Sequence, residues 1–182
     1  MIYPRTGGQA PAPPEVPSEI AKDFNEACVV LNDSAQASGA LSRRCLQHVL
    51  AERGVSTSDN LNRAIEDALA SHLPSHIAHD LDAIRNIGNF AAHPQKSVST
   101  GAILPVEPHE AEWNLHVLEM LFDFYYVQPA KSAARRVALN KKLKEAGKPL
   151  MKEPDTGGDD TRQLGTTEGS ANSGAAPDVA RS

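Results

Sequence analysis

The sequence has little cysteine, few aromatic residues and no long apolar run, and each scarcity excludes a class of protein. Its only two cysteines, Cys28 and Cys45, lack the spacing of a zinc-ligand pair and fall on apolar helix faces, so we expect buried free thiols. No run of about eighteen apolar residues occurs, and no basic-then-apolar start indicates a secretory signal. We therefore expect a cytoplasmic protein that does not enter a membrane.

Motifs of several enzyme classes are also missing. The glycine pairs Gly7-Gly8 and Gly157-Gly158 are not followed by Lys-Ser or Lys-Thr, so neither is a phosphate-binding loop. The chain has no serine elbow of the hydrolase type, and no pair of acids stands beside a conspicuous apolar pocket. These absences predict that the chain uses no cofactor.

Three histidines raise the question of a metal site. His72, His76 and His79 are spaced by four and three residues, which is a ligand-like pattern. Pro74 interrupts a helix between the first two, so the three do not share one continuous face. We weigh a metal site against surface or capping histidines, favour the second and predict no metal.

Periodicity predicts an all-α fold, a bundle of about five helices with a basic helical extension and disordered termini. The helices are expected at about 18–32, 35–53, 60–72, 75–93 and 108–127. The predicted parts are a Pro-rich extended arm (1–17), the bundle (18–128), a basic helix (129–147) and a disordered tail (148–182). Pro129 is expected to end or kink the fifth helix.

The segment 75–93 carries the most unusual polar residues. Its core-facing stripe includes Ile77, Leu81 and Ile84. A polar seam runs along another face, bordered by Arg85 and made of His79, Asp82, Asn86, Asn89 and His93. The seam is interpreted either as a packing network between helices or as a site for an anion or phosphate. In the second case Arg85 supplies charge, His93 moves protons, and Asn86 and Asn89 orient the ligand.

This segment also carries a family resemblance. The run Ile84-Arg85-Asn86-x-Gly88-Asn89-x-Ala91-Ala92-His93 resembles the signature of the HEPN-like domain of unknown function 4145. The segment Ala37-x-x-Ala40-Leu41-x-Arg43-Arg44 fits the same family, as do Tyr3-Pro4, Pro17 and Glu26-Ala27. The resemblance covers about residues 1–130. It implies a mostly bacterial domain that occurs alone or attached to restriction and other defence proteins.

The wider HEPN superfamily implies a bundle that often dimerises, with metal-independent ribonucleases among its members. Those enzymes carry an Arg, four to six residues and then a His, whereas seven residues separate Arg85 from His93 here. The extra residue rotates the His by about 100° relative to the Arg. We therefore expect a non-catalytic module first and a ribonuclease using Arg85 and His93 as the alternative.

Two further groups of cations are candidate binding residues. Arg43 and Arg44 are either solvated charges or, together with Arg85, part of an anion-binding patch. From residue 131 to 148 seven basic residues accompany one acid, whereas residues 18–130 hold seven basic and fifteen acidic residues. The basic helix is a solvated face or a sequence-independent phosphate contact made by Lys131, Arg135, Arg136, Lys141, Lys142 and Lys144.

Three functions follow from these patterns and from what the resemblance implies. The first is a non-catalytic interaction or ligand-binding module in a bacterial defence or stress system, which forms a homodimer and contacts a protein partner. The second is the metal-independent ribonuclease. The third is non-specific nucleic-acid binding, with RNA as the partner, through the basic helix.

Overall fold

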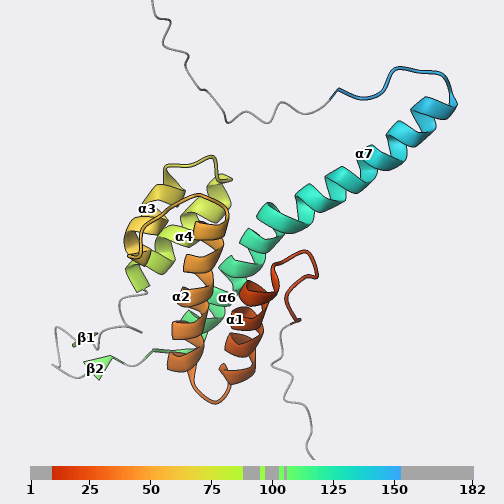
Figure 1. Ribbon diagram of the computed structural model, residues 1–182. Coiled ribbons are helices and arrows are strands. Elements are labelled where there is room, and N and C mark those ends of the chain that lie inside the picture. The colour runs from red at the N-terminus through yellow and green to blue at the C-terminus, as the bar shows by residue number, and fades with distance from the viewer. Residues whose placement is uncertain (1–9, 88–94, 97–102, 105, 153–182) are drawn as a thin grey trace, which may run out of the picture.

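The computed structural model of the chain describes residues 10–87, 95–96, 103–104 and 106–152 (Figure 1). The predicted all-α class is confirmed. Within these residues, five helices form a bundle: α1 (Ser18–Val30), α2 (Ala35–Glu52), α3 (Leu61–Leu69), α4 (Ser75–Ile87) and α6 (Pro108–Phe122). Two two-residue strands, β1 (Gln95–Lys96) and β2 (Ile103–Leu104), pair antiparallel between α4 and α6. The predicted tail beyond residue 152 lies outside the described residues.

Local side-chain chemistry determines where the helices begin and end. The hydroxyl of Ser34 accepts a hydrogen bond from the Ala37 backbone amide at the start of α2, and Asn60 caps α3 through Arg63 in the same way. Gly54 follows α2 with a φ of 65°, a left-handed conformation that favours glycine at a helix end. These caps satisfy backbone groups that the helix itself leaves unpaired.

The core lies where α2 packs against α1 and α6. Phe24 of α1 meets Phe122 of α6 edge-to-face, with ring centroids 5.1 Å apart. Aliphatic side chains fill most of the rest of the buried space, and both cysteines are buried thiols that form no disulfide, as predicted. The N-terminal arm is anchored to α1, because the Ala12 amide donates to Asn25 Oδ1 and Val16 is buried.

The fifth predicted helix continues past Pro129, so this proline does not end it. A π-helical turn, η1 (Asp123–Val127), joins α6 to α7 (Gln128–Glu145), and the Gln128 amide bonds to the Asp123 carbonyl. The wider turn admits Pro129, which has no amide hydrogen and whose ring would crowd a carbonyl in a regular helix. Tyr126 holds this turn to α2 by donating its hydroxyl hydrogen to Glu52 Oε2 at 2.7 Å.

Helix α7 extends away from the bundle (Figure 1). It is 18 residues long, about 27 Å at 1.5 Å per residue, and none of its residues is buried. Its main contact with the described chain is η1, from which it continues. After Gly147 the chain turns back, and the Met151 amide bonds to Asn140 Oδ1. None of the described helices combines the length and apolarity that a membrane span requires.

Candidate functional site

Arg85 lies near the C-terminal end of α4, where its charge is opposed by two carboxylates. Its Nη2 is 2.8 Å from Asp82 Oδ1 on the preceding turn, and its Nη1 is 3.3 Å from Glu66 Oε1 on α3. The apolar face of α4 is buried as predicted, through Ile77, Leu81 and Ile84. Packing of that face leaves Arg85 at the α3–α4 boundary, with its side chain about a third exposed.

The structure describes only some of the other residues of the polar seam. Asn89 and His93 lie outside the described residues, and so does the side chain of Asn86, although its backbone belongs to α4. His79 is exposed. The convergence of Arg85 and His93 on one catalytic spot therefore stays a prediction.

Arg44 is held by a carboxylate of α1. Its Nε donates to Asp23 Oδ2 at 3.0 Å and its Nη2 donates to Asp23 Oδ1 at 2.6 Å. This bonding raises the pKa of Arg44, and the same hydrogen bond lowers the pKa of the Asp23 carboxyl although burial opposes it. His48 Nδ1 also lies 3.2 Å from Asp23 Oδ2.

Arg43, one residue earlier on α2, is in a different environment. Its side chain is half-buried, its Nη1 is shielded from solvent, and this nitrogen has no hydrogen-bond partner among the described residues. Burial lowers the pKa of its guanidinium. Arg44 and Arg85 are thus paired with carboxylates on different helices, and the shared anion-binding patch with Arg43 stays a prediction.

The predicted nucleic-acid residues all lie on α7. Five of them, Lys131, Arg135, Lys141, Lys142 and Lys144, are exposed, whereas Arg136 is half-buried and donates to the Lys152 carbonyl of the returning chain. None of the six forms an ion pair with any described residue. Among the described residues, these six cations therefore lack an ion-pair partner.

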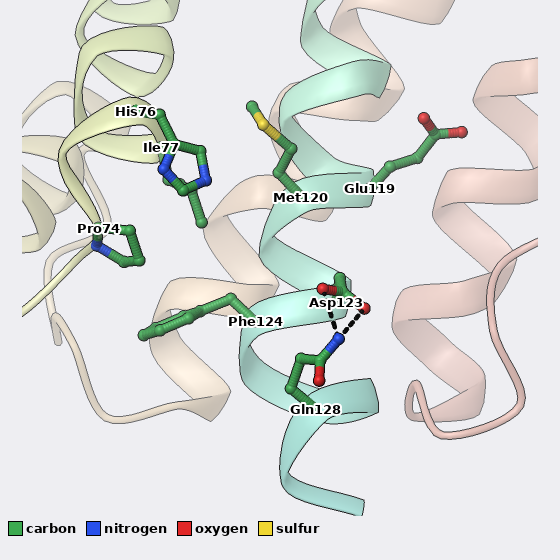
Figure 2. A pocket seen from close by; sticks show the side chains of 8 residues that line it. All are labelled: Pro74, His76, Ile77, Glu119, Met120, Asp123, Phe124 and Gln128. Carbon is green, nitrogen blue, oxygen red and sulfur yellow. Dashed lines mark hydrogen bonds between the residues drawn. The ribbon is translucent and has the colours of Figure 1, made fainter. Parts of the chain in front are cut away.

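Two grooves flank the outer edge of α6 and η1. The first, of about 370 Å³, has an apolar lining of Pro74, Ile77, Met120 and Phe124 (Figure 2). Its polar rim includes Asp123, whose two carboxylate oxygens accept hydrogen bonds from Gln128 Nε2 at 3.1 and 3.0 Å.

The second groove, of about 430 Å³, lies between the N-terminal arm and this same edge. Pro11 and Pro13 line it from the arm, and Lys131 lines it from α7. Glu119 and Asp123 line both grooves, so these carboxylates form the ridge between them.

Sequence reasoning missed these carboxylates and the π-turn beside them. The sequence did contain signals for both. Glu112, Glu119 and Asp123 share one helical face. Pro129 follows a strongly apolar stretch in which no residue before it indicates a helix end. In the described part of the chain, no three His, Cys, Asp or Glu side chains gather in a way that would hold a metal ion. His72 and His79 are exposed, and His76 lines the first groove.

Comparison with known proteins gives one match. The family model described as "Domain of unknown function (DUF4145)" matches residues 25–146, which is more than half of the chain. No curated protein matches the chain, and no solved structure matches it. The matched range includes α2, α3, α4, α6, η1 and α7, so the exposed basic helix lies within the matched region.

Proposed function

The chain belongs to the DUF4145 family of domains of unknown function, and from this premise we propose that it is a non-catalytic interaction module that self-associates. The resemblance noted in the sequence favours a cytoplasmic role in a bacterial defence or stress system. Family membership names no activity, so the proposal is argued from the arrangement of charged groups.

The observation that carries the proposal is the exposure of α7. Most helices in proteins owe their stability to the burial of an apolar face, and bridging between domains is one role of a helix without such a face. Helix α7 buries no residue, carries six basic residues and one acid, and makes its main contact with η1, from which it continues. Its exposed side chains include Val137 and Leu139, at 71% and 45% exposure. An acidic partner fits this surface.

The pairing of the bundle cations supports a non-catalytic role. A ribonuclease needs a cation available to stabilise the charge that develops on the phosphate. Arg85 already contacts Asp82 and Glu66, so a phosphate would have to displace two carboxylates. The carboxylates thereby oppose the use of Arg85 as the phosphate-binding group.

The direct test of the non-catalytic role is RNA cleavage by the purified chain with a chelator present. We expect no cleavage above the background of a His93→Ala variant, across single-stranded and hairpin RNAs. Metal-independent cleavage that disappears in this variant would instead establish the ribonuclease alternative. An Arg85→Lys variant tests the second residue. If RNA cleavage is lost in this variant as well as in His93→Ala, both residues take part in the reaction.

Nucleic-acid binding through α7 is the second candidate, favoured by the exposed cations that lack ion-pair partners. Contacts to a phosphate backbone weaken steeply with salt, because they release counterions. Fluorescence anisotropy with a labelled single-stranded RNA, repeated over a salt series, measures this dependence. The second candidate predicts that Lys141→Glu with Lys142→Glu abolishes binding and flattens the salt slope, whereas the self-association proposal predicts only weak binding at low salt.

A further inference from the structure

The continuous helical element from α6 through α7 changes the sign of its charge at its middle. Residues 107–127 contain five acids and no Lys or Arg, whereas residues 128–145 contain six basic residues and one acid. The acidic half lies on the bundle and the basic half extends away from it (Figure 1). One element therefore presents two surfaces of opposite charge, one on each side of η1.

The outward face of the acidic half carries polar residues at regular intervals. Glu112, His116, Glu119 and Asp123 follow one another at steps of four, three and four residues, which places them on one face of a helix. Glu112, His116 and Asp123 are exposed, and the Glu119 side chain is 41% exposed. The face opposite this edge packs into the core through Leu118, Leu121 and other buried residues. We call these four positions the acidic edge.

The basic half repeats the same spacing. Lys131, Arg135, Ala138 and Lys142 also follow at steps of four, three and four, and all four are exposed. We call these positions the basic edge. In a regular helix the eight residues from Asp123 to Lys131 would rotate the second edge by about 80° from the first. The π-turn accommodates one extra residue and so cancels most of this rotation. Asp123 and Lys131 indeed line the same groove.

We infer that a second copy of this chain packs antiparallel along the element, so that the acidic edge of each copy faces the basic edge of the other. The steps of four, three and four residues are the same when counted from either end. The two edges therefore stay aligned when the second copy runs in the opposite direction. The antiparallel register places Glu112 opposite Lys142, Glu119 opposite Arg135 and Asp123 opposite Lys131. A two-fold axis passes near Val127, which makes each ionic contact occur twice.

This inference rests on the proposed self-association and identifies its surface. A second copy satisfies both edges at once, whereas an acidic polymer would satisfy only the basic edge. An exposed ion pair stabilises little by itself, but several aligned pairs select partner and orientation together. The exposed apolar side chain of Leu139 lies near the basic edge and adds contact area to the same surface.

Charge reversal on α7 tests the pairing without threatening the fold, because α7 buries no residue. The variant Arg135→Glu with Lys142→Glu reverses two positions of the basic edge. Its matched control, Lys141→Glu with Lys144→Glu, makes the same change in net charge on other faces of the same helix. In sedimentation velocity at low salt, we expect the first variant to weaken the dimer by about tenfold or more, because like charges then face each other. The control should stay close to wild type.

Complementation then distinguishes pairing from a general charge effect. The variant Glu112→Lys with Glu119→Lys should also weaken its own dimer, and mixing it with Arg135→Glu/Lys142→Glu should restore a heterodimer in which every reversed pair is again attractive. Circular dichroism confirms that each variant is folded.

The other outcomes overturn the inference in distinguishable ways. Edge variants that dimerise like wild type would reject these edges while leaving the proposed self-association intact. A wild-type chain that is monomeric at every concentration would reject both. An unchanged oligomeric state, combined with loss of single-stranded RNA binding in Arg135→Glu/Lys142→Glu, would assign α7 to nucleic acid instead.

Discussion

Arg44 and Asp23 form a two-point ion pair between α2 and α1, with Nε to Oδ2 at 3.0 Å and Nη2 to Oδ1 at 2.6 Å. The Asp23 side chain is only 7% exposed, whereas that of Arg44 is 53% exposed. The pair therefore fastens a buried carboxylate to a cation at the surface. Arg44 is a candidate for anion binding, but the Asp23 carboxylate already occupies its guanidinium.

Replacing Arg44 with methionine should destabilise the fold. Methionine keeps an unbranched apolar stem of similar reach but leaves the buried Asp23 carboxylate without its main partner. We expect the free energy of unfolding at neutral pH to fall by about 1–3 kcal/mol, the usual cost of leaving a buried polar group unpaired. Urea denaturation measures this change in the free energy of unfolding. Arg63→Met on α3, an exposed cation, is the control and should change stability by less than about 0.5 kcal/mol. Equal losses in both variants would contradict the assigned role of the pair.

The same pair should make stability fall in acid. The hydrogen bond from Arg44 lowers the pKa of Asp23 below its ordinary value of 3.8 in the folded state. A depressed folded pKa stabilises the protein above the unfolded pKa, and this stabilisation disappears as pH falls through the folded pKa. Wild type should therefore lose stability below about pH 4 faster than Arg44→Met does. A gap between the two proteins that stays constant from neutral pH into this acid range would contradict the prediction.

Two glycines with the same backbone conformation should respond differently to alanine. Gly54 ends α2 at φ 65° and Gly147 follows α7 at φ 64°, and no atom lies within 4 Å of a Cβ built at either position. Gly54→Ala should cost about 1 kcal/mol of unfolding free energy, because the left-handed conformation is unfavourable for a residue with a Cβ. Gly147→Ala should leave global unfolding unchanged, because α7 does not pack on the core. Equal destabilisation would show that α7 unfolds together with the bundle.

Much of the bundle was predictable from the sequence, because the apolar period fixes which helix face is buried. Ile77, Leu81 and Ile84 are buried as the period predicts, and the helix expected at about 35–53 is α2, Ala35–Glu52. The helix through Pro129 was not predictable by local rules, because a proline normally stops a helix unless a wider turn admits it. That turn depends on tertiary contacts such as the hydrogen bond between Tyr126 and Glu52, which are 74 residues apart.

The candidate site was less predictable than the fold, for a related reason. Helical spacing shows which residues share a face, and Arg85 does pair with Asp82, a seam residue three positions before it. It cannot show which residues of another helix oppose that face. The contact of Arg85 with Glu66 and that of Arg44 with Asp23 both depend on helix pairing, so the neutralisation of these cations appears only in the structure.

Self-association is the central claim, and sedimentation velocity of the wild-type chain over a concentration series and a salt series tests it most directly. The account predicts a dimer at low salt whose dissociation constant rises as salt is added, because exposed charge pairs are screened. A chain that sediments as a monomer throughout would contradict the account. A dimer whose dissociation constant does not change with salt would support the self-association, but its interface would then lie elsewhere than on the acidic and basic edges.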